Sequence, residues 1–212
     1  MLELLMAGGK AMIPIVILSA FALAIICERM WSLRRKSVLP DGLSEEVRSW
    51  AQQRRLEPDH IDALEKNSPL GAVLAAALRA RHLGREAIRE RVEDTGRHVM
   101  HDLERFLPTL GTIALVSPLA GLLGTVIGMI QMFLAILEHG IGDANHLAGG
   151  IGEALVCTAA GLVVAIPAYM FHRYFRAKVA DFGIRMEKQV IGLLDHLEGE
   201  AAVTAQAKRV AR

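Results

Sequence analysis

The stretch that decides the fold is FLPTLGTIALVSPLAGLLGTVIGMIQMFLAIL, residues 106–137, which contains no charged residue. A bilayer core about 30 Å thick needs roughly 20 apolar residues of helix, so this stretch can cross a membrane with its ends tilted or projecting. Two further apolar windows, residues 10–33 and 147–171, are also long enough. The sequence therefore predicts an all-α membrane protein with three transmembrane helices.

The composition fits this class, because the charged residues gather outside the apolar windows. The chain has 24 Lys and Arg and 23 Asp and Glu, and its net charge of +1 gives no reason to expect nucleic acid as a partner. Cys27 and Cys157 lie inside apolar windows, so we interpret them as packing residues. The first window lacks a basic start and a small-x-small cleavage site, and is therefore interpreted as a retained anchor.

The basic residues lie on one side of the predicted membrane. Only Lys10 precedes the first span, whereas residues 34–105 hold fourteen Lys and Arg and residues 173–212 hold eight. Positive charge favours the cytoplasmic side. We therefore expect a periplasmic N-terminus, a periplasmic turn over residues 138–146, and a cytoplasmic loop and C-terminus.

Four segments follow from this pattern: residues 1–33, the N-terminus and first span; 34–105, a cytoplasmic helical loop; 106–171, a hairpin of the second and third spans; and 172–212, a cytoplasmic helical tail. Apolar side chains recur at three-to-four spacing before the second span and after the third, which predicts amphipathic helices that cover each other. These stripes are Ile88, Val92, Val99, Leu103 and Phe106, and Phe175, Val179, Phe182, Met186, Val190, Leu193 and Leu197. No strong breaker separates either stripe from its neighbouring span, so we expect helices 2 and 3 to continue well below the membrane into the cytoplasm.

Small residues follow one side of the second span. They are Gly111, Ala114, Ser117, Pro118, Gly121, Gly124, Thr125 and Gly128. In lipid, such faces let helices approach closely, so the first interpretation is a helix-packing face. The second is that this face surrounds a central pathway or another protein's helix, with Thr125 as its polar point. A threonine hydroxyl also bonds to its own helix, so Thr125 alone does not decide between them.

Glu153 is the one ionisable residue of the third window. A carboxylate inside a span is energetically unfavourable and usually functional, although Glu153 also lies close enough to the outer end to reach the interface. Thr158 follows five residues later, about 140° around a helix of 3.6 residues per turn, so the two side chains face different neighbours. Pro167 is tolerated if neighbouring helices satisfy the freed carbonyl.

The remaining chemical groups give weaker signals. His98 and His101 cluster with Asp94 and Asp102 and could hold a metal, but a solvated polar face explains them better. The sequence has no phosphate-binding loop, nucleophile elbow or metalloprotease histidine pair, so we predict that the chain is not an enzyme and holds neither metal nor cofactor.

Three segments together resemble a known family. Residues 117–130, SPLAGLLGTVIGMI, closely resemble the second-span motif of the ExbB/TolQ/MotA proton-channel proteins. Residues 150–162, GIGEALVCTAAGL, followed by AIPA at 165–168, resemble the third-span motif, and ERMW at 28–31 is similar to the family's exit from the first span. Ala120 and Cys157 depart mildly from the pattern. Three spans, rather than the four of MotA-type members, place the resemblance in the ExbB/TolQ branch.

The resemblance implies an energy-transducing stator of the bacterial inner membrane. Such proteins form pentamers around helices of an ExbD- or TolR-like partner, whose aspartate carries the proton, and act on a TonB- or TolA-like protein. Thr125 and Thr158 match the family's pore-facing threonines and Glu153 its third-span carboxylate, while helix packing is assigned to Gly121, Gly124, Gly128, Pro118, Gly161 and Pro167. The short chain favours an ExbB-like member; a TolQ-type subunit for envelope integrity and a passive scaffold for the partner are the alternatives.

Overall fold

The computed structural model describes residue 9 and residues 11–52, 58–139 and 144–210. This part of the chain is helical throughout, without strands. Three helical segments are long and apolar enough to cross a membrane: Met12–Ser32, Arg85–Leu137 and Gly149–Asp195. The prediction of an all-α protein with three membrane-spanning helices is therefore confirmed. Residues 140–143 of the predicted turn at 138–146 lie outside the described residues, and the flanking residues belong to the ends of α8 and α9.

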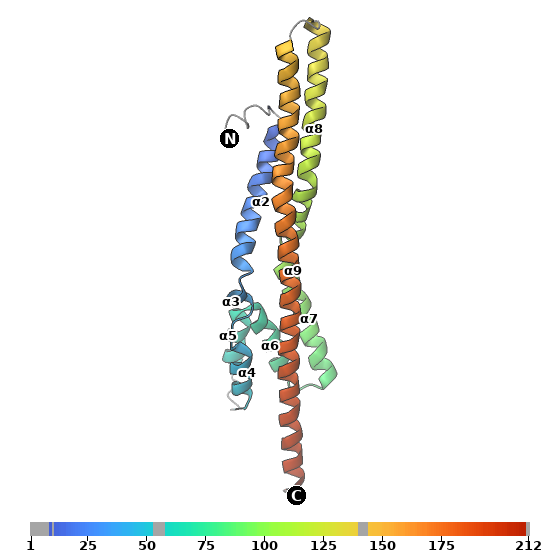
Figure 1. Cartoon of the computed structure of the whole chain (residues 1–212). Coiled ribbons are helices and arrows are strands. Elements are labelled where there is room, and N and C mark those ends of the chain that lie inside the picture. Colours follow the sequence, from blue (N-terminus) through green and yellow to red (C-terminus); the bar gives the residue numbers. More distant parts are fainter. Residues whose placement is uncertain (1–8, 10, 53–57, 140–143, 211–212) are drawn as a thin grey trace. The chain divides into compact units, whose positions relative to one another are not determined.

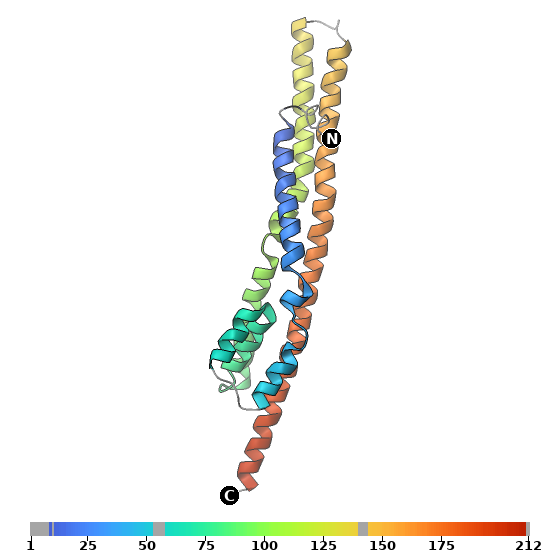
Figure 2. The ribbon, with the colours of Figure 1, turned by 90° about the vertical axis from the view of Figure 1, so that its left-hand side faces the viewer.

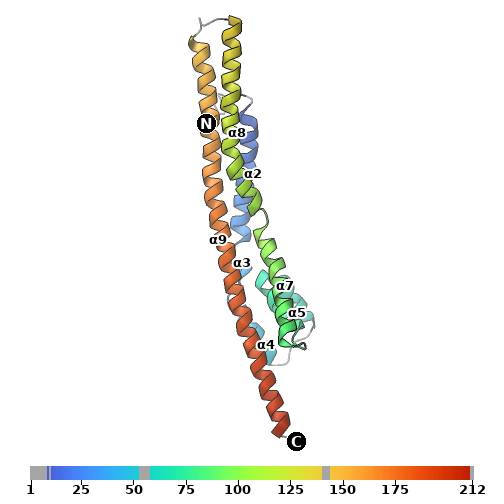
Figure 3. The ribbon, with the colours of Figure 1, turned by 90° about the vertical axis from the view of Figure 1, so that its right-hand side faces the viewer.

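The chain forms two compact units, one of Met1–Arg29 with Phe106–Phe175 and one of Met30–Arg105 with Arg176–Arg212. The first unit contains most of α2 (Met12–Ser32), all of α8 (Leu107–His139) and the first part of α9 (Ala144–Val210). Figures 1 and 3 show α8 running alongside α9 in this unit. It holds the second and third apolar windows in full and most of the first.

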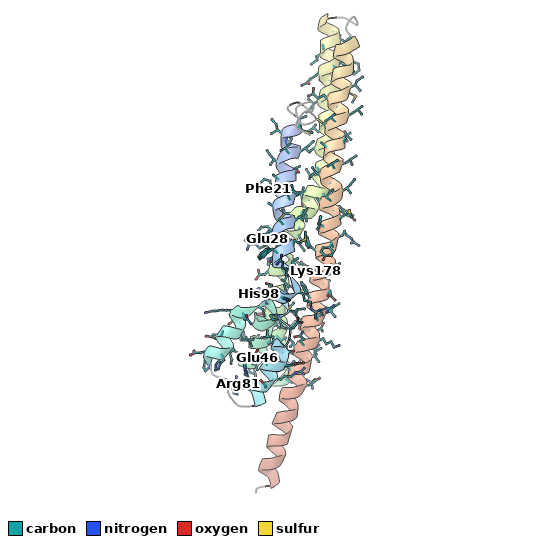
Figure 4. All side chains as sticks on the ribbon, turned by 60° about the vertical axis from the view of Figure 1, so that its left-hand side comes forward. Phe21, Glu28, Glu46, Arg81, His98 and Lys178 are labelled. Carbon is teal, nitrogen blue, oxygen red and sulfur yellow. The ribbon has the colours of Figure 1, made fainter. Side chains whose placement is uncertain are left out.

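One face of α2 is buried and the other is open. Met12, Ile15, Ala22 and Ile26 are buried at three-to-four and seven-residue spacing, as a helix with one packed face requires. Phe21 lies on the opposite face, where 60% of it is exposed (Figure 4). An open apolar face of this kind suits lipid or the membrane-embedded surface of another chain.

The second unit is a cluster of short helices with the later part of α9. These are α3 (Arg35–Val38), α4 (Leu43–Gln52), α5 (Pro58–Asn67), α6 (Pro69–Arg79) and α7 (Arg85–Glu104). The apolar α6 packs against α5 and α7, and Figure 2 shows these helices beside one another. Ser68 caps α6, because its hydroxyl accepts the Gly71 amide at 3.1 Å.

The tail stripe on α9 forms the core of this second unit. Phe182, Met186, Val190 and Leu193 are all buried. The helix reaches Met100 of α7 at Gly183 and Arg48 of α4 at Gly192. On the surface, Arg79 forms ion pairs with Asp62 and, at 2.7 Å, with Glu65. The hydrogen bonds that Arg79 donates to the carboxylates of Asp62 and Glu65 raise its pKa above the ordinary value.

One expectation about the helices is wrong. Whereas α9 is continuous over 67 residues, the second predicted rod is interrupted between α7 and α8. Phe106 has φ 64°, a left-handed conformation that ends one helix before the next begins. The cause is Pro108, which has no N–H and whose ring would collide with the carbonyl of Glu104 in a continuous helix.

Candidate functional site

The candidate site lies in the first unit, where α8 and α9 approach closely through glycines. A Cβ added to Gly121 would lie 2.8 Å from the carbonyl oxygen of Cys157 and 3.0 Å from the Cα of Thr158. A Cβ added to Gly161 would lie 2.5 Å from the carbonyl oxygen of Ser117. Because real Cβ atoms do not approach backbone this closely, only glycine fits at these two points of the crossing.

The close contact continues toward the end of the hairpin at which α8 ends and α9 begins. A Cβ on Gly124 would lie 2.7 Å from the Cβ of Cys157, and one on Gly128 would lie 3.2 Å from the Cβ of Ala154. Cys157 is fully buried in this contact. The four glycines to which helix packing was assigned therefore all lie between α8 and α9.

The two prolines lie in different surroundings. Pro118 is half-buried beside Ser117, which is fully buried and donates its hydroxyl to the carbonyl of Ile113 at 2.7 Å. Pro167 is exposed on α9. Both α8 and α9 continue through their prolines. Pro118 thus borders the glycine contact, and Pro167 does not take part in it.

Thr125 and Thr158 direct their hydroxyls to the same turn of α8. Thr158, on α9, donates across the interface to the carbonyl of Gly121 at 3.3 Å. Thr125 donates to the carbonyl of Leu122 at 2.7 Å, within its own helix. Since Gly121 and Leu122 are consecutive, the two predicted pore threonines bond to neighbouring carbonyls of α8, and both side chains remain partly exposed.

Glu153 faces a different neighbour. A Cβ added to Gly9 would overlap Oε1 of Glu153 and lie 2.8 Å from its Cδ, so the carboxylate rests on the backbone just before α2. Gly9 has φ 57°, which glycine adopts without strain. The structure therefore places the Glu153 carboxylate on the backbone just before α2, where the Cβ of Ala11 would lie 3.4 Å from a Cβ on Gly124.

The clustered histidines show no metal geometry in the described part of the chain. His98 and His101 are exposed on α7, and Asp94 forms an ion pair with Arg97 at 3.5 Å. Figure 4 labels His98 on this helix. Within the described residues, no group of three potential ligands is close enough to hold a metal ion.

Two features of this unit were missed by reasoning from sequence. One is an open apolar groove of about 490 Å³ beside the glycine contact, lined in part by Gly111, Ala165, Tyr169 and His172. The other is the contact of Arg29 with the ring of Phe106, 5.5 Å from its centroid. Both the groove and the contact depend on tertiary packing, which the pattern along the sequence does not report.

Comparison with known proteins agrees with this arrangement. The MotA/TolQ/ExbB proton channel family matches residues 65–188. The chain is 35% identical over 176 residues to the biopolymer transport protein ExbB-like 1 of Synechocystis sp., covering 82% of this chain and 69% of that protein. It is 30% identical to the Tol-Pal system protein TolQ of Haemophilus influenzae, covering 72% and 64%, and 36% identical to ExbB of Salmonella typhimurium, covering 49% and 44%. A family match over more than half of the chain and three apolar helices lead to one conclusion: this is a multi-pass inner-membrane protein that belongs to the ExbB/TolQ branch of the MotA/TolQ/ExbB proton channel family.

Proposed function

We propose that the chain is the channel and stator subunit of a complex that converts the proton motive force into work. A single-span partner of the ExbD/TolR type would carry the protonatable aspartate, and a TonB- or TolA-like protein would receive the motion. The observation that carries the proposal is the convergence of the Thr125 and Thr158 hydroxyls on one turn of α8 within apolar spans.

The hydrogen bonds of these hydroxyls suggest how they act on an acid. A hydroxyl has one proton to donate and two lone pairs that accept. Because Thr125 and Thr158 donate to the carbonyls of Leu122 and Gly121, their oxygens are left as acceptors. Acceptors stabilise a protonated carboxylic acid or a water molecule, whereas a charged carboxylate needs donors. The threonines would therefore favour the neutral form of the partner's aspartate as it passes.

Glu153 has a separate role in this proposal. Its carboxylate rests on Gly9, before α2, so it tunes the outer end of the pathway or holds the start of α2 rather than sharing the proton of the threonine pair. Replacing Glu153 with Gln keeps the shape and removes the charge. Loss of flux with intact assembly would assign Glu153 to conduction, and loss of assembly would assign it to structure.

The assembly that we propose is a homopentamer with a central pore, its N-terminus periplasmic and its C-terminus cytoplasmic. Large apolar side chains on all three spans support an oligomer in lipid, among them Phe21, Leu115, Leu122 and Val163, which are 56–71% exposed. The excess of Lys and Arg in residues 34–105 and 173–212 supports the orientation. Native mass measurement of the co-purified complex tests the stoichiometry.

Proton flux into liposomes with a pH-sensitive dye inside tests the function. We expect flux from the chain reconstituted with an ExbD/TolR-like partner, and little from the chain alone. Replacing Thr125 and Thr158 together with Val should lower the flux by at least about tenfold, since two hydrogen-bond acceptors along the proposed pathway are lost. The double replacement with Ser, which keeps both hydroxyls, is the matched control. Equal flux from the Val and Ser proteins would refute the role of the hydroxyls.

Two alternatives use the same partner class. A TolQ-type subunit would support envelope integrity through a TolA-like protein, and the identity to TolQ of Haemophilus influenzae favours testing it. Complementation of strains that lack either system separates the TonB-type role from the TolQ-type role. A passive scaffold would assemble with the partner and yet leave flux unchanged in every variant of Thr125, Thr158 and Glu153.

A further inference from the structure

Phe106 is not the residue type that its backbone conformation favours. The break between α7 and α8 follows from Pro108, but glycine or asparagine would form it without strain. A bulky aromatic residue at φ 64° is a genuine outlier, and it persists only where the surroundings hold it. The presence of Phe at position 106 therefore needs a contact that is made by its ring.

Arg29 supplies that contact. Its guanidinium carbon lies 5.5 Å from the centroid of the Phe106 ring, within the range of a cation–π interaction. Arg29 is only 5% exposed although it carries a charge. Glu28 binds the same guanidinium at two points, through Nε and, at 2.6 Å, through Nη2. This planar pairing fixes the orientation of the guanidinium, which a lysine could not reproduce.

The contact joins the last turn of α2 to the start of α8. Leu107 and Leu110, in the first turn of α8, are 3% and 0% exposed, so this end of the helix is packed rather than frayed. From Phe106 to Thr125 a helix rises about 28 Å at about 1.5 Å per residue. A tilt of roughly 5° at Phe106 would then move Thr125 by about 2.4 Å, most of a hydrogen-bond length.

We propose that Arg29 is a positioning residue: with Glu28 it holds the ring of Phe106, and so fixes the base of α8 and the place of Thr125 in the pathway. The proposal rests on the proposed function for its effect on proton flux. The anchoring itself is independent of that function and has a structural readout of its own.

Substitutions at Phe106 separate the ring from the strain. Phe106→Tyr keeps an aromatic face, Phe106→Leu removes the ring and keeps the strain, and Phe106→Gly removes the ring and relieves the strain. We expect flux within twofold of wild type for Phe106→Tyr, and a loss of about threefold to tenfold for both Phe106→Leu and Phe106→Gly. Wild-type flux in Phe106→Gly would overturn the proposal, because the ring would then have no role beyond tolerating the break.

The arginine is tested in the same assay. Arg29→Lys keeps the charge and loses the planar pairing, so its flux should fall by a similar factor. The matched control is Arg34→Lys, because Arg34 makes a cation–π contact with Trp31 at 4.2 Å on an exposed surface. If Arg29 acts through the ring, the double variant with Phe106→Leu should be no worse than either single variant. If the fold losses of flux in the two single variants multiply in the double variant, the coupling between Arg29 and Phe106 is refuted.

A distance measurement distinguishes this inference from the proposed function. Spin labels at the exposed Cys27 of α2 and at Thr109→Cys of α8, in a Cys157→Ala background, report the spacing of the two helix ends in the assembled complex. We expect a narrow distribution in the labelled parent protein and in Phe106→Tyr, and a broad one in Phe106→Leu and Phe106→Gly. Unchanged distributions in the last two would overturn the inference. If the labelled parent protein gives a narrow distance distribution but conducts no protons, the proposed function is refuted and the anchoring stands.

Discussion

Replacement of Gly161 with Ala is the sharpest test of the packed hairpin. The added Cβ would lie 2.5 Å from the carbonyl oxygen of Ser117 and 3.3 Å from the Cα of Gly121. Non-bonded carbon atoms pack at about 3.5 Å or more, and the 2.5 Å contact is shorter than this by about 1 Å. The helices α8 and α9 must therefore separate by roughly 1 Å at this point. The hydrogen bond from Thr158 to Gly121 is already 3.3 Å long, and such a separation would break it.

The free-energy change follows from three contributions. Overpacking against backbone costs about 1–3 kcal/mol. Loss of the Thr158 hydrogen bond adds about 0.5–1.5 kcal/mol. Alanine favours the helix over glycine by about 1 kcal/mol, which offsets part of the loss. We therefore expect Gly161→Ala to destabilise the hairpin by about 1–3 kcal/mol, which is a factor of roughly 5 to 150 in the unfolding equilibrium.

Gly152→Ala is the matched control on the same helix, because nothing lies within 4 Å of a Cβ at that position. It should be neutral or stabilising by up to about 1 kcal/mol. Reversible unfolding of the purified chain in mixed micelles, with helical content as the signal, measures both variants under one condition. If Gly161→Ala and Gly152→Ala unfold at the same denaturant fraction, the close approach of α8 and α9 is not what holds the hairpin together.

Three smaller perturbations test other contacts by thermal unfolding in detergent. Ser68→Ala removes the cap of α6 and should cost about 1 kcal/mol, whereas Ser68→Asp should retain most of the stability. Gly183→Ala should be neutral or stabilising by up to about 1 kcal/mol, because alanine favours the helix and its Cβ would meet only the flexible end of Met100, 3.1 Å away. Arg79→Gln should cost under about 1 kcal/mol and less in high salt, since its ion pairs are exposed. The raised pKa of Arg79 means that this stabilisation is present below the unfolded-state pKa and lost only in strong alkali, so the difference from wild type should be equal at about pH 7 and about pH 9.

The spans and the family could be predicted from sequence because they depend on local composition. Charge-free windows such as residues 106–137 report membrane helices directly, and the tail stripe of α9 follows a helical period with its face buried. The break at Phe106 was missed because the amphipathic pattern runs through it. Pro108 is the signal for the break, and its effect on the preceding backbone outweighs the amphipathic periodicity.

The contacts of the site were beyond sequence reasoning for a different reason. Arg29 and Phe106 are far apart in the chain, and nothing in the sequence of either segment predicts their contact. The carboxylate of Glu153 could be placed near the outer end of its span, but its contact with Gly9 depends on where α2 begins relative to α9. Such pairings arise from packing between elements, which periodicity along one element does not contain.

The geometry also bears on which component moves during transport. α8 and α9 are joined at glycines where backbone meets backbone, and packed contacts of this kind change between discrete arrangements rather than continuously. The base of α8 is fixed to α2 through Phe106. Glu153 is the one carboxylate in the third window, the second window has none, and the side chain of Glu153 rests on the backbone at Gly9. A proton relay needs a group that charges and neutralises beside the hydroxyls of Thr125 and Thr158. In the complex that we propose, that group belongs on the partner, which would move past a hairpin held together by the glycine contact.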